Sequence, residues 1–431
     1  MLKLQNKKGG AYIIVFLFDM IAKLLMAVAT VITIRILSVE EYAIYTKFNS
    51  ISLLSSSIIG LGLTMAYVRF AAELVSRGKA NSVRLFQLCS LLILVLSIAS
   101  FAFIPISNKI FSTTTSVSLM ALIYGGLLSL NKMNQSFFQV DERFSISGII
   151  TNIKNIALCV IIAALPILFK DVTDNQAIIA TIISVVIAYF IGYYYISRRR
   201  SPQEDEAIDT RLFVRLLKEC WWLIVYCLLI CLFDQGCVII MSHISTDTDI
   251  AVYGIASKYY MLMLTFLTSL MTVLRIRTSH QTMIDSKDHR REFTINWIKR
   301  IWWVAGSICL AVAIVSKPLL NFLNGDSYGE VVPTFNILVI GVFISYLFAP
   351  NVSVMMSGKR YKELCVLALL SFAINCLLCF VLIPHYGAIG AAIAVVVSNA
   401  ALNIISTLII LLDKNNKQNN LQNQNTSQIN K

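Results

Sequence analysis

Residues 85–107 read LFQLCSLLILVLSIASFAFIPIS and contain no charged side chain. About 20 apolar residues of α-helix cross a bilayer core of about 30 Å, so this stretch is long enough to span a membrane. Eleven further apolar stretches fill most of the chain. They cover residues 10–34, 42–66, 117–140, 148–169, 176–197, 219–241, 250–274, 301–323, 331–357, 364–383 and 387–412.

The composition agrees with a membrane protein. Of the 431 residues, 57% are apolar and 14% are charged, whereas a soluble domain carries about 25% charged residues. The first apolar stretch is too long for a cleavable signal peptide and has no small-residue cleavage site behind it, so we expect it to be a true span. The sequence therefore predicts an all-α polytopic membrane protein with twelve transmembrane helices.

The distribution of Lys and Arg predicts the orientation. If the N-terminus is cytoplasmic, the inner segments hold 27 of the 36 Lys and Arg, and the outer loops hold 4. Positive charge gathers on the cytoplasmic side of membrane proteins, so both termini are predicted to be cytoplasmic. The net charge of +13 then indicates contact with anionic membrane lipids rather than with nucleic acid.

The two halves of the chain resemble each other in sequence. The matching segments are YAIYTK at 42–47 and YGIASK at 253–258, Asn134 and Asn351, and NIALC at 155–159 and NCLLC at 375–379. Six spans in each half would make the repeat parallel, with its axis along the membrane normal. Two six-helix bundles related in this way are expected to face each other across a central cleft.

The repeat also predicts the domain boundaries. Residues 1–200 form the N-terminal six-helix bundle, and residues 219–412 form the C-terminal one. Residues 201–218 are a cytoplasmic linker that ends in an amphipathic helix. Its apolar face, formed by Leu212, Phe213, Leu216 and Leu217, is expected to lie on the membrane surface. Residues 413–431 are rich in Asn and Gln and are predicted to be a disordered cytoplasmic tail.

Charged residues inside the spans are the candidate functional residues. A charge in mid-membrane costs at least about 2.5–3.5 kcal/mol, so it usually faces a partner or a wet cavity. The candidates for substrate binding in the cleft are Lys23, Lys47, Lys132, Lys154 and Lys258. The candidates for ion coupling or charge balance are Asp19 and Asp234. Two alternatives stay open: Asp19 and Lys23 neutralise each other, or the lysines reach the membrane surface with their long side chains.

The chemistry of these residues suits an anionic ligand. Lysine acts as a point charge toward phosphate or pyrophosphate, and the carboxylates would balance the lysines or bind a coupling H⁺ or Na⁺. Tyrosines in the spans either stack on sugar rings or pack within the protein; the candidates are Tyr67, Tyr124, Tyr259 and Tyr346. The chain has no glycine-rich phosphate loop, nucleophile elbow or metal-binding His-Glu motif, so no catalytic residue, metal or cofactor is predicted.

Three segments resemble a known family. The sequence IPHYGAIGAA at 383–392 is similar to the signature ahead of the last span of bacterial polysaccharide transporters. Residues 35–45 look like their early signature, with Ala43 where the family usually has glycine, and residues 324–338 look like the lead into their tenth span. Together with the twelve spans, the chain resembles O-antigen flippases of the Wzx type, within the multidrug, oligosaccharidyl-lipid and polysaccharide flippase (MOP) superfamily.

The resemblance implies a function. Such proteins move an oligosaccharide linked to undecaprenyl pyrophosphate from the cytoplasmic to the outer leaflet of the bacterial plasma (inner) membrane, for O-antigen or other surface polysaccharide. They are thought to work by alternating access driven by an ion gradient, and the polymerase and chain-length machinery are the expected partners. No covalent chemistry is implied, which predicts a transporter rather than an enzyme.

Three alternatives stay open at this point. A drug–cation antiporter of the same superfamily should have an acidic cleft, whereas this chain has more lysines than acids in its spans. A membrane enzyme of polysaccharide assembly should show a large outer loop or a histidine-based site. A scaffold without transport would leave the charges within the spans unexplained.

Overall fold

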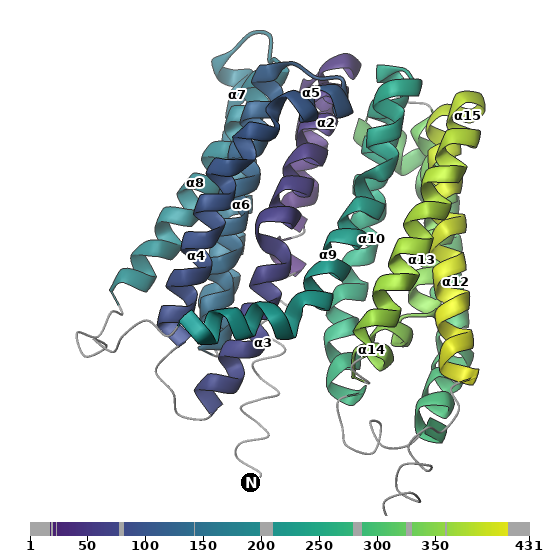
Figure 1. Ribbon diagram of the computed structural model, residues 1–431. Helices are drawn as coiled ribbons and strands as arrows, with labels where there is room; N and C mark the ends of the chain where they lie inside the picture. Colours follow the sequence, from purple (N-terminus) through teal and green to yellow (C-terminus); the bar gives the residue numbers. More distant parts are fainter. Residues whose placement is uncertain are drawn as a thin grey trace, which may run out of the picture.

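The computed structural model describes residues 18, 20–22, 24–76, 82–141, 143–198, 210–278, 287–324, 330–357 and 360–412. These residues are almost entirely helical and include no strand. The helices form two lobes that stand side by side, one from each half of the chain (Figure 1). The predicted tail at 413–431 lies outside the described residues.

The N-terminal lobe begins with a first helix that is described over residues 20–22 and 24–36. It continues with α2 (Val39–Ser56), a π-turn (Ser57–Leu61), α3 (Gly62–Ser76), α4 (Ser82–Ala99), a 3₁₀ turn (Ser100–Phe103), α5 (Ile104–Phe111), α6 (Thr115–Val140), α7 (Phe144–Leu168) and α8 (Asp174–Ser197). The rest of the described chain forms α9 (Thr210–Ile244), α10 (Asp247–Thr278), α12 (Lys287–Asn324), α13 (Val331–Leu347), α14 (Pro350–Ser357) and α15 (Tyr361–Leu412).

The helices have the length and composition of membrane spans. Within the described residues, 6 helices could cross a bilayer, or up to 8 if each of two bent pairs counts as one span. One bend, of 45° between α13 and α14, occurs at Pro350, where proline cannot continue the helix. Helix α15 contains two predicted spans, which are separated at Gly387 with φ 50°. The polytopic all-α class is confirmed, and the count of twelve stays a prediction.

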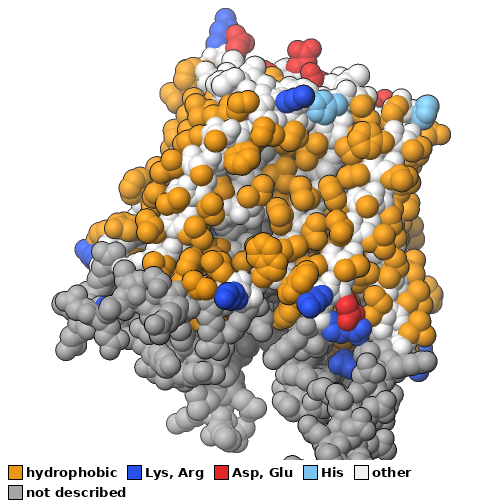
Figure 2. Space-filling view, viewed as in Figure 1, with side chains coloured by type: hydrophobic (Ala, Val, Ile, Leu, Met, Phe, Trp, Pro, Cys, Tyr) orange, Lys and Arg blue, Asp and Glu red, His pale blue; other side chains and the backbone are white. Residues whose placement is uncertain are grey.

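The surface is divided as expected for a membrane protein. We call the end that holds the starts of α2 and α10 the upper end, as in Figure 1, and the end that holds the start of α9 the lower end. Apolar side chains cover the flank of the molecule, and the charged side chains that are visible lie near its two ends (Figure 2). This apolar belt fits the hydrocarbon region of a bilayer.

Two residues of the sequence repeat make equivalent contacts in the two lobes. In the N-terminal lobe, Asn134 Nδ2 of α6 donates to the carbonyl of Tyr189 in α8 at 3.4 Å. In the C-terminal lobe, Asn351 Nδ2 of α14 donates to the carbonyl of Asn403 in α15 at 3.2 Å. Each asparagine therefore ties the fourth predicted span of its half to the sixth.

A second repeated pair of asparagines, Asn155 and Asn375, also joins equivalent spans in the two halves. Asn155 Nδ2 of α7 donates to the carbonyl of Ala22 in the first helix at 2.6 Å. Asn375 Oδ1 of α15 accepts from Cys237 Sγ in α9 at 3.3 Å. Both contacts join the fifth predicted span of a half to its first span, which supports the parallel repeat.

The buried apolar residues that the structure describes form three clusters, which lie at different levels between the upper and lower ends. The largest cluster of buried apolar residues joins both lobes, with Phe111 and Val117 from one and Val331 and Phe335 from the other. Two smaller clusters lie toward the lower end, one built mainly from the N-terminal lobe and one from the C-terminal lobe. The apolar core that the two lobes share therefore lies toward their upper ends.

The linker helix differs from its prediction. Helix α9 runs across the lower end of the N-terminal lobe before it turns upward (Figure 1). Leu216 is fully buried, and Phe213 and Leu217 pack around the lower core of the N-terminal lobe. Leu216 therefore faces protein rather than the membrane surface, whereas Phe213 and Leu217 are only partly buried. The side chain of Leu212 lies outside the described part.

Candidate functional site

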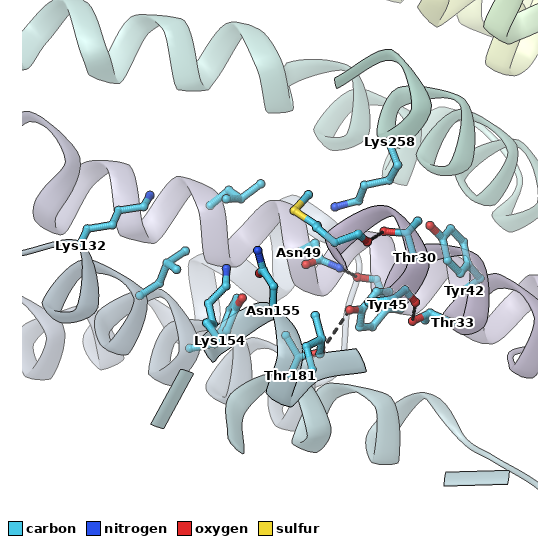
Figure 3. Close-up of a pocket in the computed structure, with 16 residues that line it drawn as sticks. Thr30, Thr33, Tyr42, Tyr45, Asn49, Lys132, Lys154, Asn155, Thr181 and Lys258 are labelled. Atoms are coloured by element: carbon cyan, nitrogen blue, oxygen red, sulfur yellow. Dashed lines mark hydrogen bonds between the residues drawn. The ribbon is translucent and has the colours of Figure 1, made fainter. Parts of the chain in front are cut away.

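A cavity of about 220 Å³ lies within the N-terminal lobe and reaches the interface with α10 (Figure 3). Most of its walls come from the first helix and from α2, α6, α7 and α8. Its lining residues are Met26, Ala29, Thr30, Thr33, Tyr42, Tyr45, Asn49, Leu53, Tyr124, Leu128, Lys132, Lys154, Asn155, Leu158, Thr181 and Lys258. The last of these is the only contribution from the C-terminal half among them.

Three predicted lysines meet in this cavity. Lys132 comes from α6, Lys154 from α7 and Lys258 from α10, and their ammonium ends point inward from different sides (Figure 3). Lys132 Nζ lies 3.5 Å from Ser56 Oγ. Within the described residues, no carboxylate pairs with any of the three. The three side chains are partly buried rather than extended into bulk water.

The electrostatics of this arrangement favour an anion. Lys154 is close enough to Lys132 and Lys258 for their charges to repel one another. Repulsion between like charges is stronger in a partly buried cavity than in water, because the effective dielectric constant is lower. A polyanion such as a diphosphate would replace this repulsion by attraction, and ammonium groups suit phosphate oxygens as hydrogen-bond acceptors.

Uncharged polar side chains line the rest of the cavity. Tyr45 Oη lies 3.1 Å from Thr181 Oγ1, and Thr181 donates its own proton to the carbonyl of Ala177 at 2.8 Å. Asn49 Nδ2 donates to the carbonyl of Tyr45 at 2.9 Å. The other amide of the cavity, Asn155, keeps its Oδ1 buried without a hydrogen-bond partner in the described structure.

The sequence reasoning missed these uncharged residues. A signal was present, because Tyr42, Tyr45 and Asn49 recur at spacings of three and four residues along α2 and therefore share one face. Thr30 and Thr33 are likewise three residues apart in the first helix. Uncharged polar residues at this spacing are also common in helix packing, so the spacing alone does not indicate a binding site.

Lys47 does not belong to the cavity. Its Nζ forms an ion pair with Asp247 Oδ1 at 2.8 Å, and 9% of its side chain is exposed. Asp247 is the first residue of α10, so the pair joins the lobes at the upper end. Lys47 is thus paired with a carboxylate of the neighbouring helix, and its predicted role in substrate binding stays a prediction.

The two predicted acids are placed differently. Asp234 lies partly buried on α9 and does not line the cavity. Its carboxylate is near enough to Cys231 and Tyr260 to interact with them electrostatically. Asp19 and the predicted cleft lysine Lys23 lie outside the described residues.

One of the four candidate tyrosines lines the cavity. Tyr124 of α6 is part of its wall. Tyr67 is fully buried in the lower core of the N-terminal lobe, and Tyr259 packs against Phe335 with ring centroids 6.2 Å apart. Tyr346 Oη donates to the carbonyl of Met263 at 3.0 Å. The packing interpretation therefore describes Tyr67, Tyr259 and Tyr346.

Further contacts between the lobes are present at the upper end. The guanidinium group of Arg35, in the last turn of the first helix, donates to the carbonyl of Leu323 at 2.9 Å and to that of Phe322. A Cβ placed on Gly254 of α10 would come within 2.5 Å of Thr46 Oγ1 of α2, so these helices touch closely. Together with the Lys47 ion pair, these contacts close the upper end between the lobes.

The break in α15 is held by Asp249. Its Oδ1 accepts from the backbone N–H of Ala388 at 3.4 Å, and its Oδ2 accepts from Ser245 Oγ at 2.7 Å and Thr246 Oγ1 at 2.8 Å. Partial burial acts to raise the pKa of Asp249, but these hydrogen bonds outweigh it and hold the pKa below its usual value. Gly387 has a positive φ, and a Cβ there would collide with the carboxylate. This explains why the signature has glycine at 387.

Comparisons with known proteins agree with this architecture. The family described as "Polysaccharide biosynthesis protein" matches residues 9–275. No curated protein sequence matches the chain. A multidrug resistance MATE family transporter of the MOP superfamily, in an inward-facing conformation, has a TM-score of 0.76 and 12% identity over 93% of this chain and 97% of that chain.

Two further solved structures are similar. An outward-facing MATE family transporter has a TM-score of 0.67 and 13% identity over 93% of this chain and 94% of that chain. The lipid II flippase MurJ, in an inward closed conformation, has a TM-score of 0.71 and 16% identity over 93% of this chain and 86% of that chain. At 12–16% identity, these three likenesses concern the fold. The chain belongs to the polysaccharide biosynthesis protein family and has the fold of MOP-superfamily transporters.

Proposed function

We propose that this protein is a flippase that moves undecaprenyl-pyrophosphate-linked oligosaccharides across the bacterial plasma membrane, for O-antigen or another surface polysaccharide. The observation that carries the proposal is the cavity in which Lys132, Lys154 and Lys258 converge without a carboxylate among its lining residues. Lys258 comes from the other half of the chain, so a ligand held by all three lysines would contact both lobes.

The chemistry of the substrate explains the need for such a cavity. A sugar-bearing diphosphate cannot cross hydrocarbon unaided, because each unsatisfied polar group costs several kcal/mol there. Cationic side chains compensate the diphosphate charge, and the uncharged polar residues offer hydrogen bonds to sugar hydroxyls. The lipid chain needs no cavity, because it is as apolar as the bilayer core.

The conformation fits loading from the lower end. The lobes share one apolar core toward the upper end and have separate cores toward the lower end. The TM-score is also higher with the inward-facing MATE transporter, 0.76, than with the outward-facing one, 0.67. In the proposed cycle the lower end faces the cytoplasm and holds both termini. Transport then requires the upper contacts to open while the lower ends of the lobes close.

Asp234 is the proposed coupling residue. It is the acid predicted inside a span that the structure describes, and it lies on α9, the first helix of the second half. Binding of H⁺ or Na⁺ to a buried carboxylate removes the cost of an isolated charge, which links ion binding to the movement of the lobes. Asp19 remains a second candidate from the sequence. The released oligosaccharide would pass to the polymerase and chain-length machinery.

The drug–cation antiporter has support from the MATE similarity, which concerns the fold alone at 12% identity. A cationic drug would meet three lysines in this cavity and be repelled by them. The same cavity attracts a diphosphate. The flippase is therefore the better-supported function.

Binding of a defined lipid tests the proposal. Purified protein in nanodiscs is titrated with undecaprenyl diphosphate and with farnesol, an uncharged isoprenoid, and binding is followed by native mass spectrometry. We expect specific binding of the diphosphate and at least tenfold weaker binding by Lys154→Met. The matched control is Lys109→Met, which changes an exposed lysine of α5 outside the cavity.

Two results would reject the proposal. Equal binding of both isoprenoids by the unchanged protein would show that the diphosphate is not recognised. An unchanged affinity in Lys154→Met and Lys258→Met would remove the cavity from the mechanism. In cells, deletion of the gene should abolish surface polysaccharide and cause lipid-linked intermediates to accumulate in the inner leaflet.

A further inference from the structure

We propose that the cavity has two subsites in a fixed order: the lysines bind the diphosphate, and the uncharged polar residues nearer the upper end bind the sugar attached to it. This inference rests on the proposed function. It adds the orientation of the substrate and names the residues that would contact the sugar.

The lysines and the uncharged polar residues lie at different depths below the upper end. An α-helix rises 1.5 Å per residue, so Tyr45 and Thr181 lie only about 9–11 Å below the upper ends of α2 and α8. By the same measure Lys154 lies about 21 Å and Lys132 about 26 Å below the upper ends of α7 and α6. Lys258, about 16 Å below the upper end of α10, lies between the two groups.

The hydrogen bonds of the upper residues fix which of their hydroxyl groups donates and which accepts. Thr181 donates its only proton to Ala177, so Tyr45 must donate its proton to Thr181. The phenolic oxygen of Tyr45 is then an acceptor, with the Asn49 side chain as its neighbour. Asn155 lies at the level of the lysines, and its buried Oδ1, without a partner in the described structure, belongs to that lower part of the cavity wall. The upper part of the cavity wall therefore presents hydroxyl oxygens rather than ammonium groups, which suits a sugar better than a diphosphate.

The order of the subsites matches the order of groups in the substrate. In a lipid-linked sugar the diphosphate joins the lipid to the sugar. A lipid anchored in the leaflet at the lower end would place its diphosphate at the deep lysines and its sugar above them. The opposite leaflet would present the groups in the reverse order. The cavity volume, about 220 Å³, is below the 300–1,000 Å³ or so of pockets that enclose drug-sized ligands, so only the sugar next to the diphosphate is expected inside.

Paired lipid probes test this arrangement. We would measure the affinity of undecaprenyl diphosphate and of undecaprenyl diphosphate carrying one N-acetylglucosamine, with full-length protein in nanodiscs. The unchanged protein should bind the sugar-bearing lipid at least fivefold more tightly. The Tyr45→Phe/Thr181→Val variant should lose this preference and keep its affinity for the sugar-free lipid. Lys154→Met should bind both lipids at least tenfold more weakly.

Matched controls separate the hydroxyl groups from general disturbance. Tyr193→Phe removes an exposed phenol of α8, and Thr151→Val removes a hydroxyl that bonds within α7; neither residue lines the cavity. Both variants should keep the preference for the sugar. Retention of the preference in Tyr45→Phe/Thr181→Val, or an equal loss for both lipids, would overturn the inference.

A labelling experiment covers the case in which the double variant does not fold. Thr30→Cys, in a background without the native cysteines, should be protected from a water-soluble maleimide by the sugar-bearing lipid and much less by the sugar-free lipid. Equal protection by both would reject the sugar subsite. If the unchanged protein binds neither lipid, the flippase proposal itself fails; if it binds both equally, only the two-subsite inference fails.

Discussion

Lys47 Nζ of α2 lies 2.8 Å from Asp247 Oδ1 of α10, and this ion pair connects the two halves of the chain at the upper end. The lysine side chain is 9% exposed and the aspartate side chain 52% exposed. The Lys47 side chain is therefore much more shielded from solvent than the Asp247 side chain. Opening of the upper end would have to separate the two charges.

Removal of the aspartate charge should favour opening of the upper end. Asp247→Asn leaves the Lys47 ammonium group with no charged partner in a buried position, which should cost about 1 kcal/mol or more in the closed state. That energy corresponds to a change of about fivefold in a two-state population. The measurement is the rate at which an impermeant maleimide labels a reporter, Thr33→Cys, from outside the cell.

Charge exchange and an exposed acid provide the controls for this variant. Asp171→Asn neutralises an exposed aspartate between α7 and α8 and should leave the labelling rate unchanged. Lys47→Asp/Asp247→Lys should bring the rate back toward that of the unchanged protein. A labelling rate in Asp247→Asn equal to that of Asp171→Asn would show that the pair does not hold the upper end closed.

The close approach of α2 and α10 gives a steric prediction. A Cβ on Gly254 would lie 2.5 Å from Thr46 Oγ1 and 2.8 Å from Thr46 Cγ2, so Gly254→Ala should force the two helices apart. Labelling of the same reporter should rise several-fold, and Thr46→Ala in the same protein should reverse the rise. Gly306→Ala is the control, because its Cβ would meet only Phe343 at an ordinary 3.6 Å. Slow labelling in Gly254→Ala would mean that the helices adjust without separating.

The hydrogen bonds to Asp249 predict a dependence on pH. Its pKa is lowered from 3.8 in the folded protein, so its contribution to stability is present above the unfolded value and is lost as the pH falls through the lower folded value. We expect the Tm of the unchanged protein to fall more steeply below pH 4 than that of Asp249→Asn. Parallel Tm profiles of the two proteins between pH 6 and pH 3 would contradict the assignment.

Asp234 gives a prediction about energy coupling. Asp234→Asn should retain its affinity for undecaprenyl diphosphate, because the residue does not line the cavity. It should lose most of the stimulation of lipid flipping by an imposed proton or sodium gradient in proteoliposomes. Glu330→Gln, which changes an exposed acid, should respond to the gradient like the unchanged protein. Full stimulation of Asp234→Asn would exclude this residue as the coupling site.

Comparison of the four predicted cleft lysines that the structure describes shows what the sequence alone could predict. It identified Lys132, Lys154 and Lys258 as intramembrane charges, and the structure brings all three into one cavity. It treated Lys47 in the same way, although this lysine forms an ion pair with a residue 200 positions away. A mid-span lysine has the same sequence signature whether it faces a cavity or an aspartate on another helix.

The sequence by itself determined the helical membrane class, the repeat and the positions of the charges, because the length of each apolar run and the matches between the halves are local properties of the chain. The partner of each polar side chain was decided by the tertiary structure alone. Leu216 packs in a protein core instead of on the membrane surface, and Tyr45 forms a hydrogen bond with Thr181 on another helix. These outcomes depend on how helices pack, and in a bilayer that packing follows from shape and polar contacts between helices rather than from the hydrophobicity of any one of them.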